Sequence, residues 1–209
     1  MTDTALPSAA LAGLDFVAID FETANPKRAS VCQIGIAMVR SGVVTKQATS
    51  YVLPPPGHEH FADRNIAIHG ITRRTLNNAA PDKITDWPNT LERIIKFSKG
   101  LPLVGHNVSV ERSIIVQASE AHGIEYPEFE YLCSQKLAKH HLPDAPSYRL
   151  NNLVEALELA TFTHHDAGED AVACANLVIH LATTSGIADL TELWPAPKPA
   201  RPFYRRSAA

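Results

Sequence analysis

The chain has 209 residues, of which 45% are hydrophobic and 20% are charged. This length and composition fit one domain with a sizeable core, and they exclude a disulfide-stapled mini-protein, a collagen and a coiled coil. The formal net charge is −3, whereas proteins that coat duplex nucleic acid non-specifically are normally basic. Any contact with nucleic acid must therefore be local, in a groove, through a metal ion or through a terminal segment.

The first half of the chain predicts three strands. Residues 16–23 (FVAIDFET) are a nearly continuous apolar run, which is typical of a central strand buried on both faces. Residues 31–40 and 43–53 flank Ser41-Gly42 and predict two further strands joined by a tight turn. The segment 58–80 is expected to be irregular with one short helix.

The second half predicts helices that alternate with short strands. Short apolar runs predict strands at 101–105 and 131–134, and helical periodicity covers 87–98, 108–122, 134–141, 151–159 and 166–184. Asn107 is the expected N-cap of the helix 108–122, and Asp166 with Glu169 has the spacing of a capping box. This order predicts an α/β fold, a mixed sheet with an antiparallel three-strand start plus parallel strands, flanked by helices.

We expect an N-terminal extension at 1–14, one folded domain at 15–186 and a Pro-rich basic tail at 187–209. From Pro195 onward the tail has four prolines and no acid, and its cations are Lys198, Arg201, Arg205 and Arg206. Such a segment is extended rather than packed. It is either a plain tail or a contact for a partner or nucleic acid.

The chain shows no membrane or disulfide signal. No apolar run approaches the ~20 residues of a membrane-spanning helix, and residues 1–14 lack the basic start of a signal peptide. The three cysteines, Cys32, Cys133 and Cys174, are widely separated and lack zinc-finger spacing. We therefore expect a cytoplasmic protein with reduced core cysteines and no membrane partner.

Four carboxylates occupy positions that the periodicity assigns to the core. Asp20 and Glu22 point to the same side of their strand, roughly 7 Å apart, and Phe21 points to the opposite side as a core residue. Glu111 and Asp170 lie on the apolar faces of their helices. A lone buried carboxylate costs several kcal/mol or becomes protonated, and hard divalent cations remove that cost. The pattern indicates a divalent-metal site.

Each acid also has an ordinary structural interpretation. Asp20 and Glu22 could mark a strand end that emerges into solvent. Glu111 could complement the dipole at a helix start, and Asp170 could cap or pair locally. Spacing alone does not bring the four together.

A histidine pair precedes the last of these acids. His165 lies five residues before Asp170, and its ordinary pKa of about 6.5 suits it to take a proton from an attacking water. A surface-loop histidine is the alternative. The neighbouring His164 leaves the assignment between the two open.

Four segments, in order along the chain, carry motifs that occur together in one enzyme family. Residues 20–23 (DFET) resemble D-x-E-T at a strand end, 68–72 (IHGIT) resemble HGI(T), 105–111 (GHNVSVE) resemble HNxxFD, and 165–170 (HDAGED) resemble H-x-A-x-x-D. In this order, over residues 16 to about 184, they resemble the DnaQ-like DEDDh 3′–5′ exonucleases. D-x-E-T alone is weak, but the four together are specific.

The resemblance implies a ribonuclease H-like fold and two divalent cations, Mg²⁺ or Mn²⁺. Asp20, Glu22 and Asp170 would hold the ions, Glu111 would contribute to the second ion, and His165 would deprotonate the attacking water. Residues that would bind the 3′ end of the substrate are Thr23, Ile68, His69, Gly70 and Asn107.

The implied reaction is hydrolysis of the 3′-terminal phosphodiester of single-stranded DNA or short oligonucleotides, which releases nucleoside 5′-monophosphates in proofreading or repair. A DNA polymerase or clamp is the candidate partner besides the nucleic acid. The alternatives are an RNA-directed 3′–5′ exoribonuclease and a weakly active or inactive module that binds 3′ ends.

One position departs from the family pattern in a way that matters. Glu111 stands where the family has Asp, and Val110 replaces the usual Phe. A glutamate is one methylene longer, whereas catalytic geometry tolerates roughly 0.5 Å. We still expect an active enzyme, because the charge and the oxygen ligands are retained and because a binding module would not need the base His165.

Overall fold

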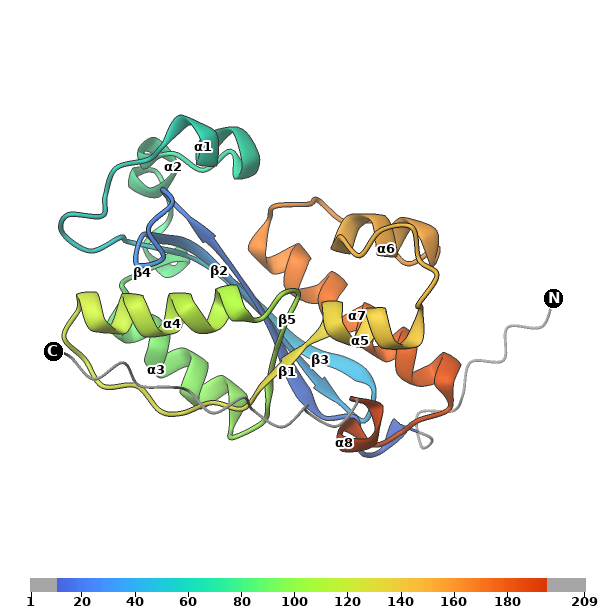
Figure 1. Cartoon of the computed structure of the whole chain (residues 1–209). Helices are drawn as coiled ribbons and strands as arrows, with labels where there is room; N and C mark the ends of the chain where they lie inside the picture. The colour runs from blue at the N-terminus through green and yellow to red at the C-terminus, as the bar shows by residue number, and fades with distance from the viewer. Residues whose placement is uncertain (1–10, 195–209) are drawn as a thin grey trace, which may run out of the picture.

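The computed structural model describes residues 11–194. Its strands are β1 (Phe16–Thr23), β2 (Val31–Arg40), β3 (Val43–Val52), β4 (Ile84–Thr85), β5 (Leu103–Gly105) and β6 (Tyr131–Cys133). They form one sheet in the order β4-β3-β2-β1-β5-β6 (Figure 1). The first three strands are antiparallel, and β4, β5 and β6 join in parallel. The predicted α/β fold with a mixed sheet is confirmed.

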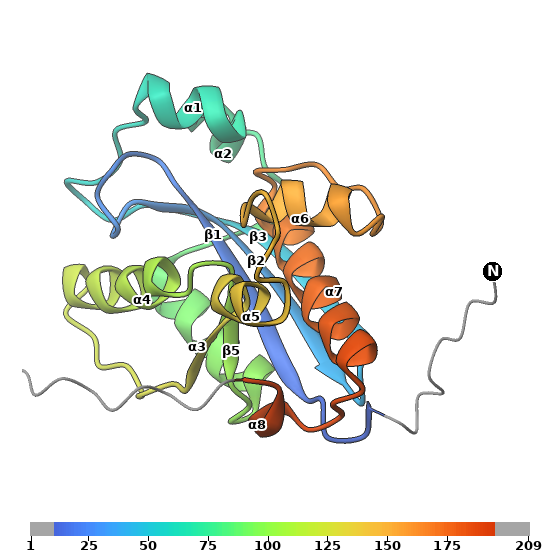
Figure 2. The ribbon, with the colours of Figure 1, turned by 45° about the vertical axis from the view of Figure 1, so that its right-hand side comes forward.

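Helices cover both faces of this sheet. The helices of the described residues are α1 (Asp63–His69), α2 (Arg73–Asn77), α3 (Trp87–Ser98), α4 (Ser109–Ala121), α5 (Ser134–His141), α6 (Leu150–Ala156), α7 (Ala167–Ser185) and α8 (Leu190–Leu193). Helices α3 and α4 lie on one face, and α5, α6 and α7 lie on the other (Figure 2). The segment 58–80 holds two short helices rather than the one expected. Within residues 11–194, no helix has the length and apolar character to cross a bilayer.

The alternation of side chains along β1 divides the core in two. Val17, Ile19 and Phe21 pack with α3 and α4, whereas Phe16 packs with α7. The Phe21 ring lies 5.9 Å from the ring of Trp87, so its predicted core position is confirmed. By the same alternation Asp20 and Glu22 belong to the α7 face.

The first turn of α7 lies directly on β2 because a glycine leaves room for it. Gly35 pairs with Asp20 in the sheet register, and a Cβ on Gly35 would lie 1.8 Å from the carbonyl oxygen of Ala167. A Cβ on Gly168 would lie 1.9 Å from Oγ1 of Thr49. Any larger residue at position 35 would push α7 away from the acids of β1.

The buried amide of Gln33 fastens the same contact. Its Nε2 donates to Oδ2 of Asp166 at 3.1 Å, and its Oε1 accepts from the backbone N–H of Ala167 at 3.1 Å. Because Gln33 spans β2 and the start of α7, it fixes where that helix begins relative to the sheet.

The two predicted caps fare differently. Asp166 is the N-cap of α7 and accepts from Gly168 and Glu169, but the Glu169 carboxylate accepts from the Thr163 N–H instead of completing a capping box. Asn107 does not cap α4, since Val108 is the N-cap residue. Asn107 has φ +77°, a left-handed conformation that Asn tolerates better than most residues, so it serves the turn before the helix.

The packed core extends beyond the predicted limits of 15–186. Leu11, Leu14, Leu190 and Leu193 are buried in the same cluster as α7, because their apolar side chains close the end of the sheet. The rest of the predicted extension and the basic part of the predicted tail, at 1–10 and 195–209, lie outside the described residues.

Candidate active site

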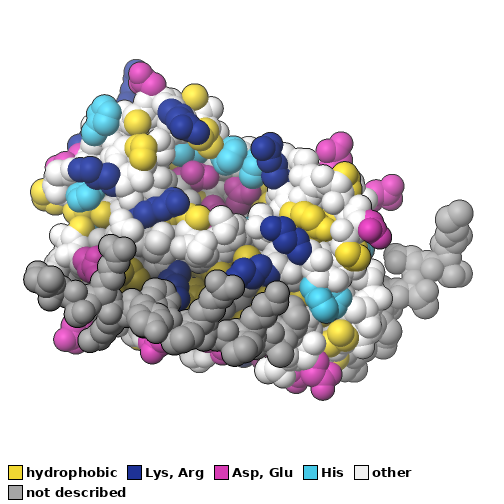
Figure 3. Space-filling view, in the orientation of Figure 1, with side chains coloured by type: hydrophobic (Ala, Val, Ile, Leu, Met, Phe, Trp, Pro, Cys, Tyr) yellow, Lys and Arg dark blue, Asp and Glu magenta, His cyan; other side chains and the backbone are white. Residues whose placement is uncertain are grey.

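Three of the predicted acids converge at the end of β1. One carboxylate oxygen from each of Asp20, Glu22 and Asp170 lies within 4.8 Å of the others. Strand alternation places the first two, and the close approach of α7 to β2 brings the third. Figure 3 shows acidic and histidine side chains gathered in a hollow between the α1–α2 region and the α6 side of the molecule.

The fourth acid, Glu111, points inward from the first turn of α4. The residue is 3% exposed, and its Oε2 is buried with no hydrogen-bond partner among the described residues. Its side chain folds over Gly105, where a Cβ would lie 2.8 Å from that oxygen. Its charge acts on Asp20, so the expected inward orientation is found. The structure does not place it within the 4.8 Å group of the other three.

Burial raises the pKa values of all four carboxyls, and repulsion from neighbouring carboxylates adds to it at Asp20 and Glu22. Burial, followed by the charges of Glu111, Asp170 and Glu22, raises the pKa of Asp20 well above its usual range. Burial and then the charge of Asp170 raise the pKa of Glu22 to about 8. Burial also raises the pKa of Glu111 and of Asp170. Four carboxyl groups whose ionisation is opposed by burial are the set that a hard divalent cation satisfies, so these residues fit such ions.

This electrostatic strain predicts that metal-free protein loses stability as the pH rises. The pKa of Glu22 is 4.5 ordinarily and about 8 in the fold, so between these values the folded state binds more protons than the unfolded state. Stability must then fall with increasing pH across that window. In EDTA the melting temperature should drop between about pH 4.5 and 8, and Mg²⁺ should raise it more at the higher pH.

Thermal denaturation with EDTA or Mg²⁺ at several pH values measures this effect. Glu22→Gln should flatten the dependence on pH, since the substituted group no longer titrates. An equally steep dependence in the variant would assign the effect to other groups.

Both histidines of the predicted pair reach the acids. Nδ1 of His164 lies 2.9 Å from Oδ1 of Asp170, and Nδ1 of His165 lies 3.7 Å from Oε1 of Glu22. The two rings stack with centroids 3.8 Å apart. Burial, and then the neighbouring His164, lower the pKa of His165. A lowered pKa favours the neutral imidazole that a base requires.

Thr23 and His69, which are 46 residues apart, meet beside the acids. Nδ1 of His69 accepts from the N–H of Ile71 at 3.0 Å, so Nε2 carries the proton and donates to the Thr23 carbonyl at 3.1 Å. The Asn65 side chain donates to the same carbonyl at 2.9 Å. These bonds tie α1 to the end of β1.

The other residues that the sequence predicts to bind the substrate are exposed to solvent. Ile68 is 46% exposed on α1, and Gly70 ends that helix in the left-handed region at φ +71°. Asn107 is exposed, and its Oδ1 accepts from Oγ of Ser109 at 3.0 Å. Within residues 11–194 no hydrogen bond joins Asn107 to the acids.

The sequence reasoning missed three residues that build the site: Gln33, Gly35 and Gly105. A glycine inside a strand is a signal for a close backbone approach, and Gly35 and Gly105 both carry that signal. The polar Gln33 within an otherwise apolar strand is a weaker one.

The comparisons with known proteins agree with this geometry. The sequence model of the RNase_T family, described as an exonuclease, matches residues 17–178. The chain belongs to this exonuclease family. The predicted DnaQ-like family is confirmed, and membership implies divalent metal ions.

Relatives of this exonuclease include DNA polymerases. It is 27% identical over 184 residues to the DNA polymerase III PolC-type of Thermotoga petrophila, covering 85% of this chain and 13% of that protein. Similar figures hold for the PolC-type polymerase of Caldanaerobacter subterraneus subsp. tengcongensis, with 26% identity over 169 residues and coverage of 80% and 11%. The chain therefore spans only a small part of the curated relatives it matches.

Solved structures share the exonuclease fold at lower identity. Exonuclease X in complex with 5′ overhanging duplex DNA aligns with a TM-score of 0.62 at 23% identity, covering 82% of this chain and 93% of that one. The nuclease domain of 3′hExo, a DEDDh family member bound to rAMP, aligns with a TM-score of 0.67 at 16% identity, covering 83% and 94%.

Proposed function

We propose that this exonuclease works from the 3′ end of single-stranded DNA or short oligonucleotides and releases nucleoside 5′-monophosphates. The observation that carries the proposal is the convergence of Asp20, Glu22 and Asp170 beside the Thr23–His69 contact. The acids that can hold cations therefore lie next to the Thr23–His69 contact, which can hold the 3′ end of a nucleic-acid strand.

Each residue has a proposed role in the reaction. Asp20, Glu22, Glu111 and Asp170 would hold two ions, which supply charge stabilisation to the transition state and the leaving oxygen. His165 takes the proton from the attacking water, because its neutral imidazole lies beside Glu22.

The Thr23–His69 contact positions the terminal nucleotide. Ile68, Gly70 and Asn107 remain proposed contacts of the same nucleotide.

The relatives support DNA over RNA as the substrate. The matched proteins of about 26% identity are named DNA polymerases, which also supports the proposed polymerase or clamp partner. Because a similar structure, the 3′hExo domain, is bound to rAMP, RNA is tested alongside DNA.

The test uses a 5′-labelled single strand with Mg²⁺ or Mn²⁺. We expect a descending ladder, slower cleavage of duplex ends because the terminal base must unstack, and resistance when the 3′ hydroxyl is blocked. DNA should be degraded faster than RNA of the same sequence. Mononucleotides released from the 5′ end, or internal cuts, would contradict the polarity, and undiminished cleavage in EDTA would contradict the metal requirement.

Replacing the proposed base should slow the reaction strongly. His165→Ala is expected to lose about 10²-fold in turnover, the low end for removal of a general base, with binding of Mn²⁺ retained. His164→Ala should be much milder, because the ring of His164 contacts Asp170 rather than the proposed site of water attack.

Single-turnover rates and Mn²⁺ titrations of both variants measure the difference. If His164→Ala shows the larger loss, the roles of the two histidines are exchanged.

A further inference from the structure

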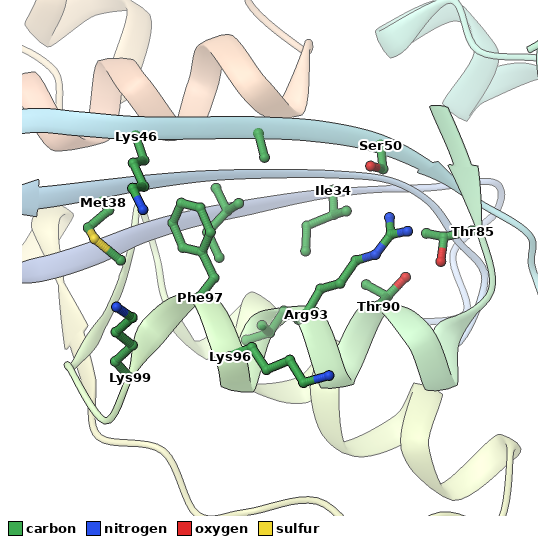
Figure 4. Close-up of a pocket in the computed structure, with 13 residues that line it drawn as sticks. Ile34, Met38, Lys46, Ser50, Thr85, Thr90, Arg93, Lys96, Phe97 and Lys99 are labelled. Atoms are coloured by element: carbon green, nitrogen blue, oxygen red, sulfur yellow. The ribbon is translucent and has the colours of Figure 1, made fainter. Parts of the chain in front are cut away.

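A groove of about 360 Å³ runs along β2 and β3 on the face covered by α3 (Figure 4). Asp20, Glu22 and Asp170 lie on the opposite face of the sheet, and Glu111 does not line the groove, so the groove is separate from the active site. Its floor consists of residues paired across the two strands: Ile34 with Ser50, Ile36 with Ala48, and Met38 with Lys46. Paired residues project to the same face. The small side chains of Ser50 and Ala48 leave the outer part of this face hollow.

The groove has an apolar middle and two positive ends. Phe97 of α3 projects toward the floor between them (Figure 4). At one end Arg93 extends toward Ser50, and at the other end Lys46 and Lys99 lie on opposite walls. This arrangement matches a ligand with an apolar centre between two anionic groups.

In the part of the chain that the structure describes, the positive ends have no partners of opposite charge. Lys96, a further lining residue, pairs with Glu92 at 2.5 Å. Arg93, Lys46 and Lys99 form no ion pair within residues 11–194, and no acid lines the groove. A bound carboxylate would therefore meet a cation at either end without competing for an existing pair.

The spacing of the ends indicates the form of the ligand. Lys46 and Ser50, which mark the two ends on β3, are four residues apart, or about 13 Å along a strand. In an extended peptide, residues i, i+2 and i+4 share one face. Acids at i and i+4 with an apolar residue at i+2 would reach both ends and the middle.

The outer edge of β3 can receive such a peptide. Strand β4 pairs only with Tyr51 and Val52, so along 43–50 no further strand within the described part of the chain pairs with this edge. An exposed edge offers main-chain donors and acceptors to an added strand. The edge and the groove beside it therefore form one surface for an extended segment.

We propose that this surface binds an extended segment of a partner protein in which two acidic residues, four positions apart, flank an apolar one. The aliphatic floor favours a peptide over single-stranded nucleic acid, since nucleic-acid grooves combine cations with several stacking rings, and among residues 11–194 Phe97 is the one aromatic residue that lines this groove. The segment 195–209 of this chain has four cations and no acid, so its charge is wrong for the site.

Selection from a display library of random nine-residue peptides on the full chain tests the proposal. We expect enrichment of the acid-x-apolar-x-acid pattern. Labelled enriched peptides should bind at least ~10-fold more weakly to Arg93→Glu and Lys46→Glu, which repel the acids, and to Ala48→Trp, which fills the hollow. Lys136→Glu, an exposed charge reversal on α5, is the matched control and should bind normally. All four variants should degrade a short oligonucleotide at the rate of the unmodified chain, which shows that they fold.

Three results would overturn the proposal. One is no enrichment above that on Arg93→Glu, and another is enrichment of basic or uncharged peptides. The third is that labelled single-stranded DNA, or a second copy of the chain detected by sedimentation, shows the dependence on Arg93 and Lys46 that the peptides lack.

Discussion

Asp20→Asn should lower turnover by about 10³-fold or more and, in the same protein, raise the melting temperature in EDTA. Asp20 is the acid on which the charges of Glu111, Asp170 and Glu22 all act, so it sits at the centre of the site. Its loss removes a ligand from the ions that stabilise the transition state, a contribution of several kcal/mol, and each ~1.36 kcal/mol is tenfold in rate.

The stability change has the opposite sign because asparagine keeps the shape and removes the buried charge. Without metal, that charge only repels its neighbours, so the neutral side chain should stabilise the fold, most clearly above pH 7. Added Mg²⁺ should then stabilise the variant less than the unmodified chain.

Turnover of a labelled oligonucleotide and melting curves with EDTA or Mg²⁺ check both halves of the expectation. Asp82→Asn, on an exposed residue, is the matched control and should change neither. A variant that is inactive and also less stable in EDTA would indicate that Asp20 has a packing role instead.

The sequence predicted those parts of the site that follow from local periodicity. Alternation along residues 16–23 assigned Asp20 and Glu22 to one face and Phe21 to the other, and helical periodicity predicted that Glu111 points inward. The convergence of these acids with Asp170 depends on how closely α7 approaches β2. That distance is set by Gly35 and by the amide of Gln33.

Other errors arose where one residue type serves two purposes. Asparagine is favoured both as an N-cap and in left-handed turns, and at position 107 the turn is the use found. The acid Glu169 has the spacing for a capping box, but its carboxylate accepts a hydrogen bond from the N–H of Thr163 in the preceding loop instead. Leucines distant in sequence, which lie outside the predicted domain of 15–186, also pack in this core.

Glu111 stands where the motif that the sequence resembles has Asp, and the lack of a side chain at Gly105 leaves room for it. We expect Glu111→Ala to lower turnover by about 10³-fold, since a charged oxygen donor for the ions is lost. Glu111→Asp should match or exceed the unmodified rate, because it restores the family's shorter acid. Retained turnover in Glu111→Ala would mean that the residue only complements the start of α4.

Gly105→Ala tests whether the two residues act as a pair. The added Cβ would lie 2.8 Å from Oε2 and 3.0 Å from Cδ of Glu111, so the buried carboxylate must shift. An off-rotamer position costs about 0.5–1.5 kcal/mol, or up to about tenfold in rate. In Glu111→Asp the carboxylate is one methylene closer to the backbone of α4, and its oxygens can turn away from the added Cβ, so the same substitution should cost less. A double-mutant cycle on turnover, repeated on the Mn²⁺-induced shift in melting temperature, measures this coupling. Equal losses in both backgrounds would show that β5 needs glycine at 105 whichever acid stands at 111. A loss confined to the Glu111 background would show that glycine at 105 compensates for glutamate at 111.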